Sequence, residues 1–197
     1  MPLDRDFWNQ RYLETDTPWD IGSPSPPLTA LLDRIQDRAT RILIPGAGTA
    51  YEAVYLHQRG FSQVYVCDWA EAAFEHLLEN APDFPRHHLL CGDFFEMTGQ
   101  YDLMLEQTFF CAIDPSARPR YVEQVHALLV PGGKLAGLLF ATPFETPGPP
   151  FGGTESEYRA LFEARFHIKE MKIAKNSVRP RAGNELYFEM IKLKIDC

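Results

Sequence analysis

The stretch that most constrains the fold of this chain is residues 41–69, which predict one βαβ unit. Residues 42–44 form a short apolar, β-rich run, as in a parallel strand covered on both faces. Gly46-Ala47-Gly48 then predicts a sharp turn, because glycine takes positive φ and leaves no Cβ between a ligand and the backbone. A helix ending near Gly60 and a second strand ending at Asp68 complete the unit.

The same unit predicts a nucleoside cofactor. Asp68 follows the glycines by about 20 residues, the usual place for the acid that accepts hydrogen bonds from ribose hydroxyls. A dinucleotide fingerprint, G-x-G-x-x-G, needs a third glycine, and Tyr51 stands there instead. The pattern therefore favours S-adenosylmethionine (SAM) over a nicotinamide. A two-glycine turn is also compatible with a tight turn in an ordinary α/β protein.

Composition narrows the class of protein. The 197 residues are 45% hydrophobic and carry a net charge of −8, which suits one globular domain and disfavours nucleic acid or an anionic membrane as partner. The 4 cysteines show no CxxC spacing, so we expect no metal and a reducing, cytoplasmic location. We expect a small-molecule substrate, no membrane partner, and a monomer or weak homodimer.

Residues 1–40 are predicted to belong to the same domain as the core at residues 41–197. They contain a short helix at residues 4–14, on which Trp8 and Tyr12 share a face, followed by Trp19. These rings either seal a hydrophobic core or form a lid, since flat rings stack on adenine and attract a sulfonium. The residues alone leave both interpretations open.

Five further strands are predicted at residues 88–90, 101–105, 134–140, 166–174 and 185–195. The first runs into Asp93 and Phe94, which suit an adenine site, although Asp93 could equally be only a turn residue. The second opens into residues 106–113, a loop expected over the carboxyl ends of the strands, where ligands bind. The loop at residues 142–153 is rich in proline and glycine, and Thr154-x-x-Glu157 predicts a capped helix after it.

Taken together, these segments resemble the thiopurine S-methyltransferase family, and within it the plant-type halide and thiol methyltransferases. The matching segments are Phe7-Trp8 through Pro18-Trp19-Asp20-x-Gly22, Ile44-Pro45-Gly46-x-Gly48, Asp68, Gly92-Asp93-Phe94-Phe95, Thr108-Phe109-Phe110-Cys111-Ala112-Ile113, Pro115-x-x-Arg118-x-x-Tyr121 and Leu129-x-Pro131-x-Gly133. The resemblance implies an α/β, Rossmann-like SAM methyltransferase sandwich. Its sheet would be mostly parallel and seven-stranded, with helices on both faces and an antiparallel C-terminal strand.

The resemblance also implies site residues. SAM, with S-adenosylhomocysteine as product, would contact Trp8, Tyr12, Trp19, Gly46, Ala47, Gly48, Asp68, Trp69, Asp93, Phe94, Glu106 and Gln107. The substrate pocket would include Arg118, Phe109, Phe110, Phe144 and Phe151. Arg118 could instead be a surface arginine at a helix start. Two positions depart from the plant-type pattern, since Phe151 replaces a tyrosine and Tyr12 replaces a tryptophan.

The predicted reaction is methyl transfer from SAM to a small soft nucleophile, namely a thiol, hydrosulfide, thiocyanate or halide. Thiolates and halides are nucleophiles without further deprotonation, so we expect no general base. Two alternatives stay open: S-methylation of a bulkier aromatic or heterocyclic thiol such as a thiopurine, and a non-catalytic SAM-binding module.

Overall fold

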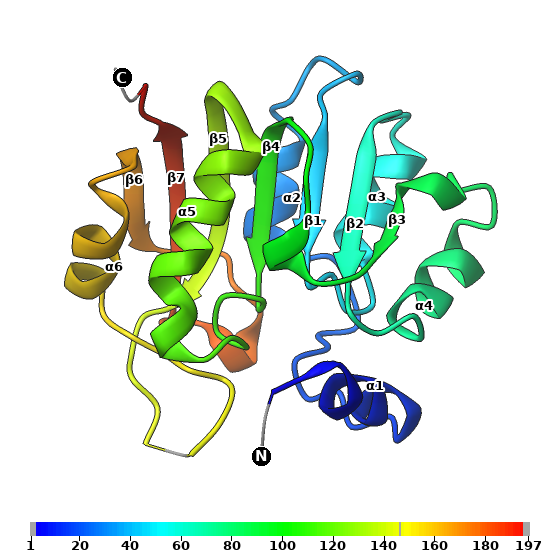
Figure 1. Ribbon diagram of the computed structural model, residues 1–197, viewed down its shortest axis with the longest axis horizontal. Helices are drawn as coiled ribbons and strands as arrows, with labels where there is room; N and C mark the ends of the chain where they lie inside the picture. The colour runs from blue at the N-terminus through cyan, green and yellow to red at the C-terminus, as the bar shows by residue number, and fades with distance from the viewer. Residues whose placement is uncertain (1–2, 146, 195–197) are drawn as a thin grey trace.

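The computed structural model describes residues 3–145 and 147–194. Its centre is a 7-stranded sheet in the order β3-β2-β1-β4-β5-β7-β6 (Figure 1). Strands β1 to β5 pair in parallel, and β7 lies antiparallel between β5 and β6, as predicted. The strands are β1 (Ile42–Pro45), β2 (Val64–Asp68), β3 (Leu89–Cys91), β4 (Tyr101–Gln107), β5 (Leu129–Phe140), β6 (Phe166–Ile173) and β7 (Glu185–Lys192).

Helices cover both faces of the sheet, which confirms the predicted sandwich. They are α1 (Arg5–Leu13), α2 (Pro26–Leu32), α3 (Tyr51–Gln58), α4 (Ala73–Asn80), α5 (Arg118–Leu128) and α6 (Glu155–Phe162). Leu32, Leu56 and Leu77 bring α2, α3 and α4 into one core cluster. Tyr121 and Phe162 bring α5 and α6 into the other. Each cluster is completed by alternate side chains of the central strands, as the period of two in a strand requires.

The predicted βαβ unit forms as expected. All 4 residues of β1 are buried, which suits a strand covered on both faces. Gly46 and Gly48 have φ of +54° and +56°, and Gly60 ends α3 with φ of +79°. The left-handed backbone at these positions explains why glycine is favoured there. The predicted capping box is also present, with Thr154 and Glu157 exchanging hydrogen bonds at the start of α6.

The fifth strand differs from the prediction. It begins at Leu129, not at residue 134, because Pro131-Gly132-Gly133 forms an irregularity inside β5 instead of a loop before it. The pairing with β4 shifts there, from Tyr101 opposite Leu129 to Leu103 opposite Lys134. A bulge of this kind inserts residues into one strand without ending it. The last strand ends at Lys192, before the predicted end at residue 195, which lies outside the described residues.

The N-terminal helix is set apart from the others. Figure 1 shows α1 beyond the edge of the sheet at which β1, β2 and β4 end. Every side chain of α1 keeps part of its surface exposed, in contrast to α2 to α6. The space between α1 and the strand ends contains the candidate site.

Candidate active site

A cavity of about 550 Å³ lies at the carboxyl edge of the sheet, under the N-terminal segment. This volume is typical of sites for small molecules and cofactors, and the edge is where open α/β sheets bind ligands. Its walls combine aromatic rings with two carboxylates, Asp68 and Asp93, and three arginines, Arg11, Arg120 and Arg181. The cofactor residues predicted from the sequence that line it are Trp8, Tyr12, Trp19, Gly46, Asp68, Trp69, Asp93 and Phe94.

The glycine turn (residues 46–48) is held between two groups of rings. A Cβ on Gly46 would overlap the ring of Phe109, so the first glycine lets the loop after β4 pack on the turn. A Cβ on Gly48 would lie 3.4 Å from Nε1 of Trp19 and 3.6 Å from the hydroxyl of Tyr12. The amide of Ala47 donates to the carbonyl of Cys67, 3.4 Å away, which ties the turn to β2. The turn therefore has room for a ligand only on its cavity side.

Asp68 stands at the end of β2 beside this turn. Its carboxylate accepts hydrogen bonds from the amide of Ala70 at 2.9 Å and, weakly, from that of Gly48 at 3.5 Å. Burial raises the pKa of Asp68 to about 6, and the backbone donors offset only part of that effect. These backbone donors, the amide of Trp69 included, use fewer than the roughly four acceptor positions of a carboxylate, so Asp68 retains acceptor capacity.

Asp93 and Phe94 occupy the next strand end. Asp93 accepts a hydrogen bond from the amide of Phe95 at 2.9 Å, so it does cap a turn. It also lines the cavity, so its role as a turn residue leaves the predicted contact with adenine possible in this position. Phe94 is buried, and Gln124 donates to its carbonyl at 2.9 Å. The turn is thus fixed from α5.

The lid segment (residues 4–22) brings three rings together over the glycine turn. Trp19 packs edge-on against Trp8 and Tyr12, with ring centroids 5.7 Å apart in both pairs. Burial, followed by the charge of Asp68, raises the pKa of Tyr12 far above its ordinary value. The hydroxyl of Tyr12 therefore stays protonated close to Asp68.

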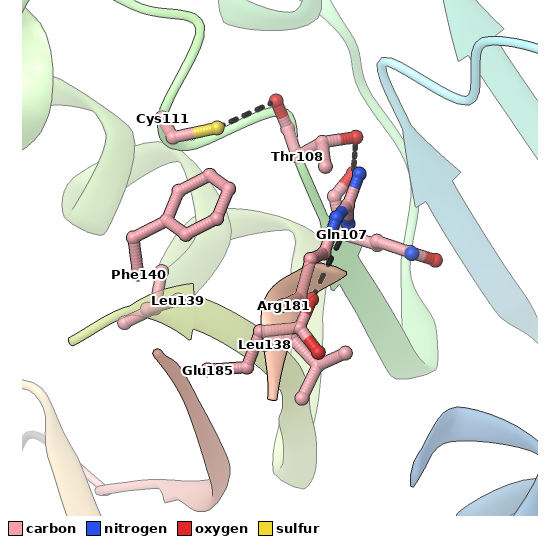
Figure 2. A pocket seen from close by; sticks show the side chains of 8 residues that line it. All are labelled: Gln107, Thr108, Cys111, Leu138, Leu139, Phe140, Arg181 and Glu185. Atoms are coloured by element: carbon pink, nitrogen blue, oxygen red, sulfur yellow. Dashed lines mark hydrogen bonds and ion pairs between the residues drawn. The ribbon is translucent and has the colours of Figure 1, made fainter. Parts of the chain in front are cut away.

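Glu106, which was expected to contact the cofactor or the substrate, does not line the main cavity. It is 1% exposed and accepts hydrogen bonds from the amides of Phe109 and Phe110, at 3.0 and 2.9 Å, and from the hydroxyl of Tyr121 at 2.7 Å. Burial raises the pKa of Glu106 to about 7. The carboxylate shapes the loop after β4 from inside the core. Gln107 lines a second, smaller cavity (Figure 2).

Of the predicted substrate residues, Phe109 lines the main cavity, and the others take different places. Phe110 is 1% exposed and packs in the core against Tyr121 and Tyr158. Phe144 packs edge-on against Phe140, at 5.0 Å between centroids.

Arg118 is neither a cavity residue nor a free surface arginine. Its guanidinium donates to the carbonyls of Phe151 and Gly152, at 3.1 and 3.0 Å, and lies over the ring of Phe110 at 4.7 Å. The amide of Phe151 donates to the carbonyl of Cys111 at 2.6 Å. Arg118 thus fastens the loop at residues 142–153 to the core.

Sequence reasoning missed Arg181, which lines both cavities. It lies in a short 3₁₀ turn, η4 (Arg179–Arg181), before β7. No local motif marks it. Because β7 runs antiparallel, however, the connection from β6 to β7 returns to the carboxyl edge of the sheet. A topological argument could therefore have placed Arg181 near the site.

Two other expectations can be compared with the described part of the chain. Within residues 3–145 and 147–194, no group of 3 or more histidine, cysteine, aspartate or glutamate side chains is arranged to hold a metal ion. None of the helices in these ranges is long and apolar enough to cross a membrane.

The fold and the cavity together define a Rossmann-like α/β protein with a cofactor-sized cavity at the carboxyl edge of its sheet. The sequence model of the thiopurine S-methyltransferase family matches residues 3–191. The chain therefore belongs to that family, as its sequence predicted. It is a SAM-dependent methyltransferase.

Individual relatives agree with this assignment. "Probable thiol methyltransferase 2" of Arabidopsis thaliana is 32% identical over 184 residues, 90% of this chain and 81% of the relative. "Thiopurine S-methyltransferase" of Photobacterium profundum is 26% identical, covering 93% and 94% of the two chains. Among solved structures, a Burkholderia thailandensis 1,6-didemethyltoxoflavin-N1-methyltransferase superposes with a TM-score of 0.74 at 22% identity, over 98% of this chain and 88% of the other. That likeness shows a shared fold.

The residues present fit SAM. Asp68 offers a buried carboxylate with spare acceptor capacity, which suits a vicinal diol. Trp19, Tyr12 and Trp8 line the cavity, and the faces of such rings attract a positively charged ligand. The glycine turn leaves the backbone accessible on its cavity side.

Proposed function

We propose that this enzyme transfers a methyl group to a small soft nucleophile: a thiol, hydrosulfide, thiocyanate or halide. The observation that carries the proposal is the lining of the cavity, which is mainly aromatic and apolar apart from two aspartates and three arginines. Similarity to proteins named "Probable thiol methyltransferase 2" and "Thiocyanate methyltransferase 1", the latter 28% identical, supports the choice of acceptor.

Such a cavity suits the chemistry. SAM supplies a methyl group on a sulfonium, and its C–S bond breaks as the bond from the nucleophile to that carbon forms. Two opposite charges neutralise in this step, so removing water favours it. Phe109 and Trp19 would exclude water and align the reactants, and proximity would provide much of the rate enhancement.

We assign the predicted roles as follows. Asp68 would accept hydrogen bonds from the ribose, Asp93 and Phe94 would border the adenine, and Trp8, Tyr12 and Trp19 would enclose the sulfonium end with Gly46. Glu106, Phe110 and Arg118 would act on the site only by holding its loops.

The lining of the cavity supports a mechanism without a general base. No histidine occurs among the described residues that line it. Cys111 lines it, but burial raises the pKa of its thiol to about 12, so this cysteine stays protonated at neutral pH. An acceptor that is already an anion removes the need for proton transfer.

A panel of acceptors with methyl-labelled SAM tests the proposal. We expect transfer to iodide, thiocyanate or hydrosulfide, detected as volatile methylated product, at kcat/KM values above those for thiophenol and a thiopurine. Faster methylation of the bulky thiols would replace the proposed acceptor with the alternative one. Tight binding of S-adenosylhomocysteine without transfer to any acceptor would indicate a non-catalytic module.

We also infer a cytoplasmic location, a monomer or weak homodimer, no nucleic-acid partner, and a single domain that includes residues 1–40. The free thiols of Cys67, Cys91 and Cys111 support the cytoplasmic location. The net charge of −8 supports the absence of a nucleic-acid partner. The buried hydrogen bond from the amide of Ser25 to Glu52, at 2.7 Å, supports the last. Size-exclusion chromatography with light scattering would test the assembly.

A further inference from the structure

The lid segment needs support from outside itself. Its helix α1 buries none of its side chains completely, so hydrophobic packing alone gives it little stability. Within the described residues, two hydrogen bonds join residues 4–22 to the remainder of the chain. The hydroxyl of Tyr51 donates to Asp20 at 3.4 Å, and the guanidinium of Arg181 donates to the carbonyl of Trp19 at 2.6 Å.

The hydrogen bond from Arg181 is the stronger of the two by geometry and charge. Its 2.6 Å length and cationic donor are typical of charge-assisted hydrogen bonds, which are about twice as strong as neutral ones. At 3.4 Å, the hydrogen bond of Tyr51 is close to the limit for any contribution.

Arg181 is itself held in place. Its second terminal nitrogen lies 3.3 Å from Oε1 of Glu185 at the start of β7, and the two side chains are 10% and 4% exposed. The guanidinium also lies 5.9 Å from the ring centroid of Phe140 in β5. Figure 2 shows Arg181, Glu185 and Phe140 around the smaller cavity. These contacts with β7 and β5 therefore hold the guanidinium in one orientation.

The carbonyl that Arg181 holds belongs to the residue at the centre of the lid. The ring of Trp19 contacts Trp8 and Tyr12, and the guanidinium of Arg11 lies over it at 5.0 Å. Because these rings contact one another through Trp19, its backbone position determines the placement of all of them over the glycine turn.

We propose that Arg181 is a positioning residue that fastens the aromatic lid over the bound SAM, with Glu185 orienting the guanidinium. The proposal rests on the assignment of Trp8, Tyr12 and Trp19 to the SAM site. It is independent of which acceptor is methylated.

Binding of S-adenosylhomocysteine measures this role without any acceptor. We expect Arg181→Met to raise the Kd about tenfold by calorimetry, as for loss of one charge-assisted hydrogen bond. Arg181→Lys should recover part of the affinity, since lysine keeps a cationic donor. Arg179→Met is the matched control, because Arg179 is exposed on the same turn, and it should change the Kd less than twofold. An unchanged Kd in Arg181→Met would overturn the proposal.

A second measurement separates positioning from direct contact with the ligand. If Arg181 acts through Trp19, Arg181→Met and Trp19→Ala should not be additive, and the double variant should bind about as weakly as the weaker single variant. Additive losses would mean that Arg181 touches the ligand itself. In the ligand-free protein, Arg181→Met should speed amide hydrogen exchange at residues 5–22, and unchanged exchange would contradict the proposal.

A third variant keeps the test valid if Arg181→Met folds poorly. Oε2 of Glu185 is buried without a hydrogen-bond partner among the described residues, so losing Arg181 leaves a buried carboxylate uncompensated. Arg181→Met combined with Glu185→Gln removes both charges. We expect this double variant to fold and still to bind S-adenosylhomocysteine about tenfold more weakly, with KM for SAM raised more than kcat is lowered. Wild-type affinity in the double variant would refute the role of Arg181.

Discussion

The two sides of the cavity are built differently. On the strand side, Asp68 and the glycine turn follow β1 and β2, whose residues are almost all buried between two layers of helices. On the lid side, α1 leaves all its side chains partly exposed and relies on a few hydrogen bonds. The strand side should therefore lose stability when it is damaged, whereas the lid side should lose ligand affinity while the fold persists.

The largest effect is expected inside the core, at Glu106. Replacing Glu106 with alanine leaves the amides of Phe109 and Phe110 and the hydroxyl of Tyr121 buried without their acceptor. We expect the free energy of unfolding to fall by about 3 kcal/mol, seen as a drop of about 6–12 °C in Tm by calorimetry. If the Tm of Glu106→Ala fell no more than that of a typical surface variant, the strand side would be no more important for stability than the lid side.

Glutamine at position 106 is the matched control. Its amide can accept both N–H groups and donate to Tyr121, as a protonated carboxyl can, so the variant should stay within about 1 kcal/mol of wild type. The folded-state pKa of Glu106, about 7, lies above the ordinary 4.5. The stability that Glu106 contributes is thus present below pH 4.5 and lost as pH rises through about 7. The Tm of Glu106→Gln should consequently fall less between pH 5 and pH 8.

An intermediate effect is expected at Asp68, where core and cavity meet. Asp68→Asn keeps the shape and removes the charge, so the Kd for S-adenosylhomocysteine should rise about 10- to 100-fold. Because burial raises the pKa of Asp68 to about 6, the wild-type carboxylate ionises as pH rises through that value. The ionised form accepts from the ribose, so affinity should increase from pH 5 to 7 and then level off.

Calorimetric titrations across this pH range test both statements about Asp68. The asparagine variant does not titrate, so its affinity should be flat wherever the wild-type affinity rises. If the variant kept the wild-type pH profile, a group other than Asp68 would be responsible for the pH dependence.

The smallest effect is expected at the weaker lid contact. Tyr51→Phe removes the hydroxyl that donates to Asp20 across 3.4 Å, and its loss should raise the KM for SAM less than threefold with no measurable change in Tm. A tenfold rise in the KM for SAM would show that this hydrogen bond, and not only that of Arg181, holds the lid segment in place. The third-glycine position would then have a functional reason to be tyrosine.

Much of the fold could be predicted from local patterns. The glycine turn, Asp68, the capping box at Thr154 and the strands of the sheet follow from short-range rules of backbone conformation and apolar periodicity. Those rules fail where one side chain has several partners within reach. Glu106 and Arg118 were both predicted to contact a ligand, but each instead forms hydrogen bonds with backbone groups of the protein.

The sequence by itself determined the family, the βαβ unit and the carboxylate at the end of its second strand, because these follow from motifs and apolar periodicity within short segments. Only the tertiary structure decided which charged groups face the cavity. Arg181 and Trp19 are far apart in sequence and meet because β6 ends, and the antiparallel β7 begins, at the edge where the lid lies. Such a contact depends on the assembled sheet, and no local spacing encodes it.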